Sequence, residues 1–208
     1  MEKPDQSVAT EQGMTYKQLE ELNRHGLTIR LGGTVNEDMV KSFRTQQRDL
    51  YKGQKEVPKE AAILLTTKGG SIQSGLELQN LINMFRLGGV ERLWIVSMVC
   101  LASSGLIVLA GQPDKRLRVV FPGTQTYHHR SSISREGTPN APAMVHEYEI
   151  AEYSSTLKKY KKIEVLLSKL FAEVTGCSEK RLKELEEHPK HLSTKEAIKY
   201  GFYGSVVK

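Results

Sequence analysis

The sequence of 208 residues predicts an α/β fold, because strand-length apolar runs alternate along the chain with patterns of helical period. Residues 27–31 alternate apolar and polar side chains, as in a half-buried strand. Residues 61–66 are mostly apolar, which is typical of a central strand buried on both faces, and residues 92–98 form a third run. Strands and helices in this order build helical layers over a mostly parallel sheet.

Two helices are expected between these strands. Apolar residues three and four apart follow the first strand and fade into the polar stretch 45–58, with Thr34 and Asn36 as candidate N-caps. A second helical pattern follows the second strand, and Ser74 and Glu77 have the spacing of a capping box at its start.

The C-terminal half predicts shorter elements and one long helix. We expect a short apolar helix at 103–110, strands at 116–121 and 124–129, helices at 180–187 and after Ser193, and a strand at 206–207. Residues 143–174 have helical period throughout, which corresponds to a helix on the order of 45 Å long. A helix of that length is expected to pack against a partner subunit.

Residues 1–25 are predicted to form a polar arm that is mobile or contacts a partner, and residues 26–208 are predicted to form a single domain.

Composition and charge exclude several classes of function. The formal net charge is +6, but the densest basic run, residues 158–162, lies in the long helical pattern and favours a solvated helix face over nucleic-acid binding. Cys100 and Cys177 form no metal or disulfide framework, which fits a reducing, cytoplasmic setting. No signal peptide is expected. Residues 93–111 carry no charge, yet they predict a buried strand and helix better than a membrane span.

Ser103 is the candidate nucleophile, because it stands at a predicted junction between strand and helix, where free backbone N–H groups stabilise negative charge. A serine needs a base within hydrogen-bond reach, and His128 and His129 are the candidates. The segment is not a Gly-x-Ser-x-Gly elbow, so the alternative of a plain N-cap with two loop histidines stays open.

The pair Gly69–Gly70 is either a plain turn or a loop whose N–H groups form an oxyanion hole. The nucleotide-binding patterns of the P-loop and of Gly-x-Gly-x-x-Gly are absent from the sequence, so nucleotide binding is not expected.

From about residue 27 to 207 the sequence resembles ClpP, the proteolytic subunit of the Clp protease, in the crotonase-like superfamily. The resemblance lies in the order of several motifs: residues 31–35, the glycine loop at 65–72, Ala102-Ser103-Ser104-Gly105, Thr175-Gly176, and Ser193, Ala197, Tyr200 and Gly201. Lys68 stands where that family usually has proline. The resemblance implies a ClpP/crotonase-like fold of repeated β-β-α units, with the long helix protruding for oligomer contacts.

The same resemblance implies a serine endopeptidase that cleaves unfolded peptides. It makes Ser103 the nucleophile and the backbone of Gly70 and Ser104, next to Gly69, the oxyanion hole. Counting seven residues from Pro122, as in that family, gives His129 as the base, and we prefer this assignment. Counting from Ser103 without a gap gives His128 instead. It also implies a homo-oligomeric ring or double ring and a separate Clp-type ATPase, with no metal or cofactor.

The third member of the catalytic triad is missing from its expected place. The resemblance puts Pro189 where the family carries aspartate, and no aspartate follows Asp114. Glu187 or Glu186, or less naturally His188, are candidates to orient the base; otherwise the site is a Ser–His dyad. A catalytically weak or inactive ring subunit is therefore the alternative function. An acyl-CoA enzyme is disfavoured, because residues 103–109 contain no carboxylate.

Overall fold

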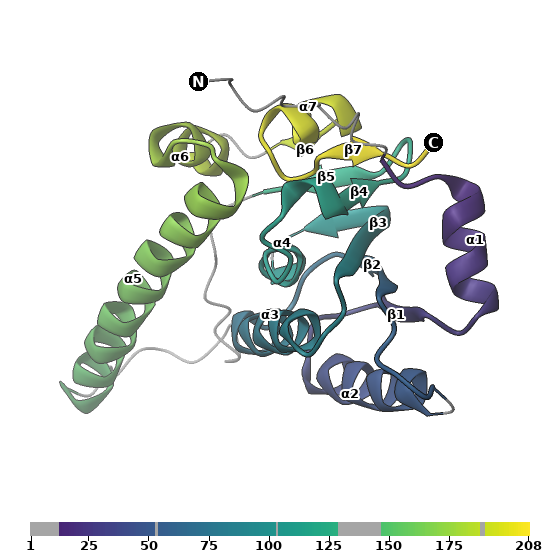
Figure 1. Ribbon diagram of the computed structural model, residues 1–208. Helices are drawn as coiled ribbons and strands as arrows, with labels where there is room; N and C mark the ends of the chain where they lie inside the picture. Colours follow the sequence, from purple (N-terminus) through teal and green to yellow (C-terminus); the bar gives the residue numbers. More distant parts are fainter. Residues whose placement is uncertain (1–12, 53, 103, 129–146, 188–189) are drawn as a thin grey trace, which may run out of the picture.

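The computed structural model describes residues 13–52, 54–102, 104–128, 147–187 and 190–208, with the backbone alone for 147–157 and 160. Over these residues seven strands form one sheet with helices on both faces (Figure 1). The strands are β1 (Thr28–Gly32), β2 (Glu60–Thr67), β3 (Arg92–Ala102), β4 (Arg118–Val120), β5 (Gln125–Tyr127), β6 (His191–Leu192) and β7 (Ser205–Val206). The helices are α1 (Tyr16–Arg24), α2 (Glu37–Tyr51), α3 (Ile72–Leu87), α4 (Ser104–Leu109), α5 (Glu147–Thr175), α6 (Glu179–Glu187) and α7 (Thr194–Lys199), with a 3₁₀ turn at Lys115–Leu117.

The sheet is mostly parallel, as the alternation of strands and helices predicts. Its order is β1-β2-β3-β4-β7, all parallel, and β5 adds to the far end of β3. Strand β3 therefore pairs with β4 through residues 95–97 and with β5 through residues 100–102. Among the strands of the described residues, β6 is the one that runs antiparallel, beside β5. The division of β3 between two neighbours brings the end of β5 next to the end of β3.

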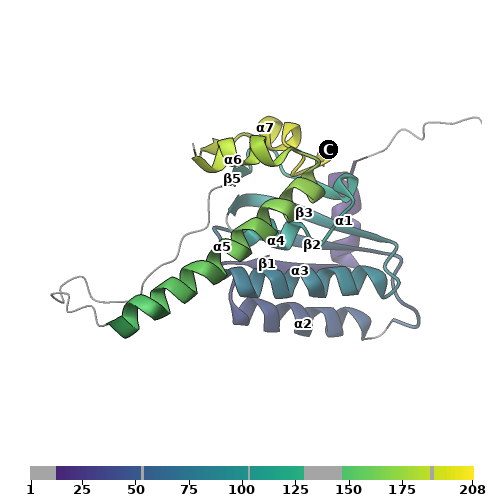
Figure 2. The same ribbon diagram turned by 90° about the vertical axis from the view of Figure 1, so that its left-hand side faces the viewer.

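Two cores lie on opposite faces of the sheet. Because side chains alternate along a strand, β2 sends Ile63 and Leu65 into one core and Leu64 into the other. Helices α2, α3 and α4 cover the first face, and α1 covers the second, as both side views show (Figures 1 and 2). The prediction that this strand is buried on both faces is confirmed.

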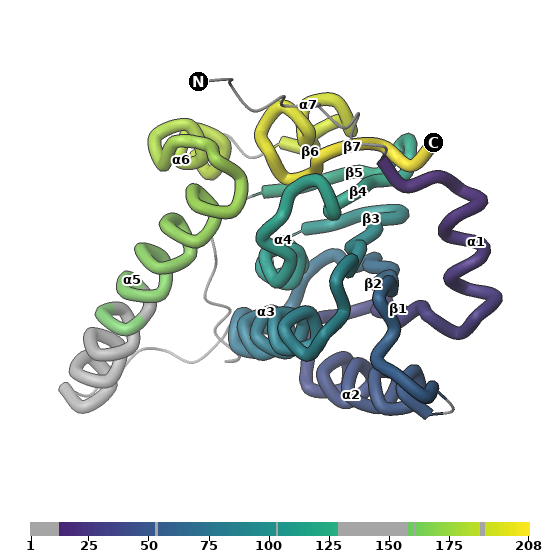
Figure 3. Tube along the Cα trace, in the orientation of Figure 1, coloured from purple at the N-terminus to yellow at the C-terminus, as the bar shows by residue number. Residues whose placement is uncertain are grey.

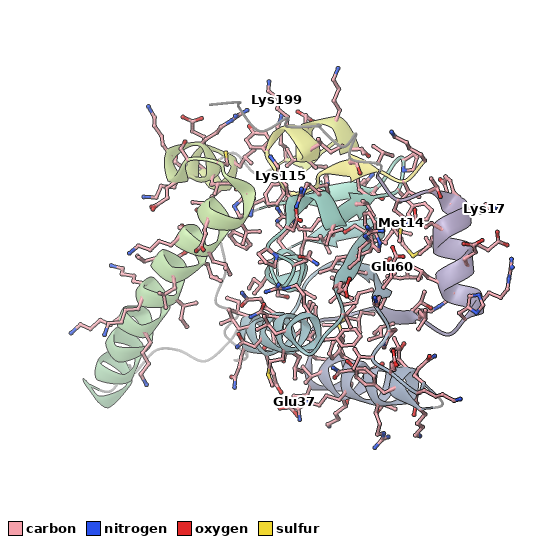
Figure 4. All side chains as sticks on the ribbon, in the orientation of Figure 1. Met14, Lys17, Glu37, Glu60, Lys115 and Lys199 are labelled. Carbon is pink, nitrogen blue, oxygen red and sulfur yellow. The ribbon has the colours of Figure 1, made fainter. Side chains whose placement is uncertain are left out.

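Residues 14–24, which we expected to belong to a mobile or partner-contacting arm, pack against the sheet. The end of the chain runs beside the start of α1 (Figure 3), and the Lys208 N–H donates to the Met14 carbonyl at 3.0 Å. Met14 is fully buried, and it lies with Glu60 between α1 and the sheet (Figure 4). The buried side chains of Leu19 and Leu22 explain the helical pattern in the sequence.

Several element boundaries differ from the prediction. Helix α2 does not fade at residue 45 but continues to Tyr51, because Leu50 is buried in the core. Strand β3 runs four residues beyond Met98, because β5 pairs with that end. Ser71, rather than Ser74, caps α3, by accepting the Ser74 N–H.

The apolar stretch at 93–111 is split between β3 and α4 around residue 103. Within the part of the chain that the structure describes, no helix has the length and apolar character needed to cross a membrane.

Helix α5 is 29 residues long and extends away from the sheet (Figure 1). Residues 143–146 of the predicted helix lie outside the described residues. Val165 and Leu166 on this helix are 55% and 66% exposed. Its C-terminal end is anchored in the body of the domain, where the buried Arg118 donates from Nη2 to the Val174 carbonyl at 2.7 Å and to the Gly201 carbonyl at 3.2 Å.

Candidate active site

The candidate site lies at the carboxyl ends of β2, β3 and β5, which are parallel and so end at the same edge of the sheet. The register pairs Thr67 with Leu101 and Ala102 with Tyr127. Ligands of open α/β sheets bind outside the carboxyl ends of the strands. The glycine loop, the start of α4 and His128 each follow one of these ends.

In the glycine loop after β2, the Gly70 N–H has no acceptor among the residues that the structure describes. The Val35 N–H donates to the Gly69 carbonyl at 3.0 Å, and the Ser71 N–H donates to the Val35 carbonyl at 2.8 Å. This pair of bonds turns the N–H of Gly70 away from Val35, and it donates to no oxygen among the described residues. Gly70 has φ +148° and is exposed. The loop therefore presents a fixed donor to solvent.

A second donor comes from the start of α4. Ser104 is the first residue of that helix, so its backbone N–H has no acceptor within the helix. Close packing holds this turn in place: a Cβ atom on Gly75 of α3 would lie 3.1 Å from the Ser104 carbonyl oxygen. The Ser104 side chain itself is buried, and its Oγ has no hydrogen-bond partner among the described residues.

His128 follows directly on β5 and is 3% exposed. The Phe171 ring meets its imidazole edge-on at a centroid distance of 5.1 Å, and the Phe202 ring lies at 5.7 Å. Its Nε2 atom is 3.3 Å from Oε1 of Glu186 on α6, within ion-pair distance but without the alignment of a hydrogen bond. The imidazole is thus held in an aromatic pocket beside one carboxylate.

The structure brings part of the predicted set together at this edge: Gly69, Gly70, Ser104 and His128. Ser103, His129, His188 and Pro189 lie outside the described residues. Glu187 is exposed and lines a groove between α5 and α6; the carboxylate in contact with His128 is that of Glu186. Among the described residues, no three His, Cys, Asp or Glu side chains gather as they would around a metal ion.

Thr67 is a site residue that sequence reasoning missed. Its Oγ1 accepts the Gly69 N–H at 3.0 Å, and its methyl group packs against Gly105 in the first turn of α4. It therefore connects the two elements that carry the free N–H groups. Its position at the end of β2 is the one feature of the sequence that points to it.

Tyr203, whose hydroxyl contacts β5, and Arg118 of β4 are polar side chains buried inside the domain. The Tyr203 hydroxyl lies 3.2 Å from Thr126 Oγ1 on β5, two residues before His128. Burial raises the pKa of Tyr203 to about 12, so the phenol stays protonated near neutral pH. Burial also lowers the pKa of Arg118 to about 10, which leaves the guanidinium charged at neutral pH.

Comparison with known proteins identifies one family. The Clp protease family model matches residues 10–208. The chain is 25% identical over 146 residues to the ATP-dependent Clp protease proteolytic subunit of Paracoccus denitrificans, and the match covers 70% of this chain and 65% of that subunit, just under two thirds of its length. It is 22% identical over 180 residues to proteolytic subunit 3 of Rhizobium etli, covering 86% of this chain and 83% of that protein.

The fold has a solved counterpart in a point mutant of ClpP1 from Listeria monocytogenes. The TM-score is 0.68 at 19% identity, and the match covers 91% of this chain and 96% of the other. At that identity the likeness establishes the fold, and the predicted ClpP-like α/β fold is confirmed.

Proposed function

Because the chain belongs to the Clp protease family, we propose that it is a serine-type endopeptidase subunit that cleaves unfolded peptides through acylation of Ser103. The observation that carries the proposal is the meeting of the Gly70 N–H, the first turn of α4 and His128 at one edge of the sheet. Ser103 lies between Ala102, the last residue of β3, and Ser104, the first residue of α4. Both neighbours therefore belong to this edge.

The proposed reaction follows the general course of acyl transfer by serine. The Ser103 hydroxyl attacks the peptide carbonyl carbon while the histidine base takes its proton, and the negative oxygen accepts hydrogen bonds from the N–H groups of Gly70 and Ser104. The same histidine then protonates the leaving amine, and water hydrolyses the acyl-enzyme. Each oxyanion donor of this kind contributes about 10²- to 10³-fold in kcat.

We propose His128 as the base, although counting from Pro122 favours His129. The support is its place directly after β5, whose last residue pairs with Ala102, and its fixed ring between Phe171 and Phe202. Peptide hydrolysis by His128→Ala and His129→Ala distinguishes the two. Loss of activity in His129→Ala alone would assign the base to His129.

Fluorophosphonate labelling of the full chain tests the nucleophile. The probe is expected to attach to wild type, with Ser103 Oγ displacing fluoride, and to leave Ser103→Ala unlabelled. Ser104→Ala is the matched control, because it keeps the backbone N–H and removes a hydroxyl that is already buried. Failure of wild type to label, or labelling that survives Ser103→Ala, would contradict the proposal.

The subunit is further proposed to assemble as a homo-oligomeric ring or double ring and to receive substrate from a separate Clp-type ATPase. Support comes from the names of the relatives, ATP-dependent Clp protease proteolytic subunits, and from the exposed Val165 and Leu166 on the protruding α5. Mass photometry of wild type and Leu166→Glu tests the assembly. A wild-type chain that stays monomeric at micromolar concentration would contradict it.

A catalytically inactive ring subunit is the second candidate, because Pro189 occupies the place of the family's aspartate. It predicts assembled particles that neither label with fluorophosphonate nor hydrolyse peptides.

A further inference from the structure

The carboxylate of Glu186 is the acidic group next to the candidate base. Its Oε1 atom lies 3.3 Å from His128 Nε2, the histidine is 3% exposed, and the glutamate side chain is 19% exposed. Opposite charges at this distance attract strongly when water is largely excluded from one side. The contact joins α6 to the end of β5, two segments that are far apart in the sequence.

The amphipathic pattern of α6 explains why this glutamate reaches the base. Leu182 and Leu185 are the buried side chains of the helix, and Glu186 follows Leu182 by one helical turn, on the same face. Glu187 is turned by about 100° from that position and is exposed. Both glutamates line the groove between α5 and α6, but Glu186 is the one that contacts the imidazole.

The groove also gives the carboxylate access to water. It has a volume of about 620 Å³ and is lined by Val165 and by charged and polar side chains of α5 and α6. Glu186 thus touches the buried imidazole on one side and hydrated surface on the other. This arrangement keeps a carboxylate beside the base without burying it completely, which would cost several kcal/mol.

We propose that Glu186 positions His128, in the role that a triad aspartate has in serine hydrolases. The inference rests on the proposed peptidase function. The carboxylate accepts the Nε2 proton of the neutral imidazole, which leaves the lone pair on Nδ1 as the basic site, and it stabilises the imidazolium formed when the base takes a proton. The contact is not aligned as a hydrogen bond in the free chain; such bonds commonly tighten when substrate is bound. Glu186 touches neither substrate nor the reacting atoms and is a positioning residue.

The ring contacts agree with this role. Phe171 meets the imidazole at 85° and Phe202 at 48°, so the plane of the ring is fixed by apolar neighbours that offer no hydrogen bond. Glu186 is the charged side chain in contact with His128 among the described residues. The orientation of the ring protons therefore depends on this carboxylate.

The test compares Glu186→Gln with Glu187→Gln in the full chain, measured as kcat and KM for peptide hydrolysis across pH. Both changes are isosteric, and Glu187 lines the same groove without contacting His128. Glu186→Gln is expected to lower kcat by about 10²- to 10⁴-fold with little change in KM. The acid limb of kcat/KM is expected to move to lower pH, because the imidazolium loses its stabilising carboxylate. Glu187→Gln is expected to match wild type.

Pro189→Asp provides a rescue in the Glu186→Gln background. An aspartate at the position that the family resemblance assigns to the triad is expected to recover part of kcat. If Glu186→Gln keeps both wild-type kcat and the wild-type acid limb, the positioning role is wrong while the peptidase function stands. If wild type itself neither labels with fluorophosphonate nor hydrolyses peptides, the proposed function fails and the positioning role with it.

A structural role for Glu186 would produce a different result. A variant that is merely unstable loses active protein, so kcat falls in proportion to the folded fraction and the acid limb stays in place. Thermal unfolding of wild type, Glu186→Gln and Glu187→Gln gives that fraction. A fall in kcat fully explained by the folded fraction would overturn the inference.

Discussion

The methyl carbon Cγ2 of Thr67 fills the space that a Cβ atom on Gly105 would need, so the two residues are in direct contact across the site. The hydroxyl of the same threonine accepts the N–H of Gly69 at 3.0 Å. One side chain thus holds the glycine loop on one side and the first turn of α4 on the other. The distance between the two proposed oxyanion donors is therefore set by Thr67 and by the absence of a side chain at residue 105.

Replacing Gly105 with alanine is expected to disturb this contact. The added Cβ would also lie 2.9 Å from Leu101 Cδ1, so both neighbours must move. Overpacking of this kind costs about 1–3 kcal/mol of stability, and the displaced α4 is expected to lower kcat for peptides. Urea unfolding and peptide hydrolysis measure the two effects.

The double variant Gly105→Ala/Thr67→Ser is expected to recover part of the lost stability and part of the lost kcat, because serine keeps the hydroxyl and removes Cγ2. Absence of any recovery would show that Leu101, not Thr67, sets the packing.

Gly70→Ala is expected to abolish most peptidase activity. A Cβ there would collide with the Val35 carbonyl oxygen, and φ is +148°, a conformation that residues with side chains rarely adopt. The loop must shift, which misplaces the Gly70 N–H, and loss of one oxyanion donor costs about 10²- to 10³-fold in kcat. Gly33→Ala is the matched control, since Gly33 has φ +99° but nothing within 4 Å of its added Cβ. Equal activity in the two variants would argue against a catalytic role of the Gly70 N–H.

The order of elements could be predicted from the sequence. It depends on the periodicity of the hydrophobic residues and on the glycines at which helices and strands end. The apolar run at 61–66 and the glycine stop at Gly176, with φ +69°, appear in the structure as expected. The length of α2 could not be predicted, since Leu50 and Tyr51 follow a polar stretch, and the packing of these two side chains on the core extends the helix.

The site was only partly predictable for a similar reason. The glycines alone left the Gly69–Gly70 loop open between a plain turn and an oxyanion hole, and the choice of Gly70 and Ser104 as donors came from the resemblance to ClpP. The leucines of α6 place Glu186 on the buried face of the helix, but its contact with His128 depends on how α6 packs beside the end of β5, which no local pattern predicts.

Low pH is expected to destabilise the start of α7, because the Glu196 carboxylate becomes protonated. This carboxylate pairs with Lys190 at 2.7 Å and accepts the Ser193 N–H, and these bonds lower its pKa to about 2. Because the folded pKa lies below the unfolded value of 4.5, the stabilisation is present above pH 4.5 and is lost as pH falls toward 2. Melting temperatures of wild type and Glu196→Gln are expected to differ at pH 7 and to converge at low pH. A difference that is independent of pH would exclude the ionised carboxylate as its source.

Arg118→Met is expected to loosen the anchor of α5. The guanidinium is fully buried, and its bonds to the Val174 and Gly201 carbonyls tie the end of the helix to the C-terminal turn. Methionine leaves both carbonyls without this donor, at about 1–3 kcal/mol for each unsatisfied group, and removal of a buried charge offsets part of that cost. We therefore expect a net loss of about 2 kcal/mol in urea unfolding, with faster amide exchange in the last turn of α5. Arg116→Met is the control, because Arg116 pairs with Asp114 at the surface, where such pairs contribute at most about 1 kcal/mol. If Arg118→Met is no less stable than Arg116→Met, the desolvation of the buried cation cancels its two hydrogen bonds, and the anchor of α5 must come from apolar packing around Phe171 alone.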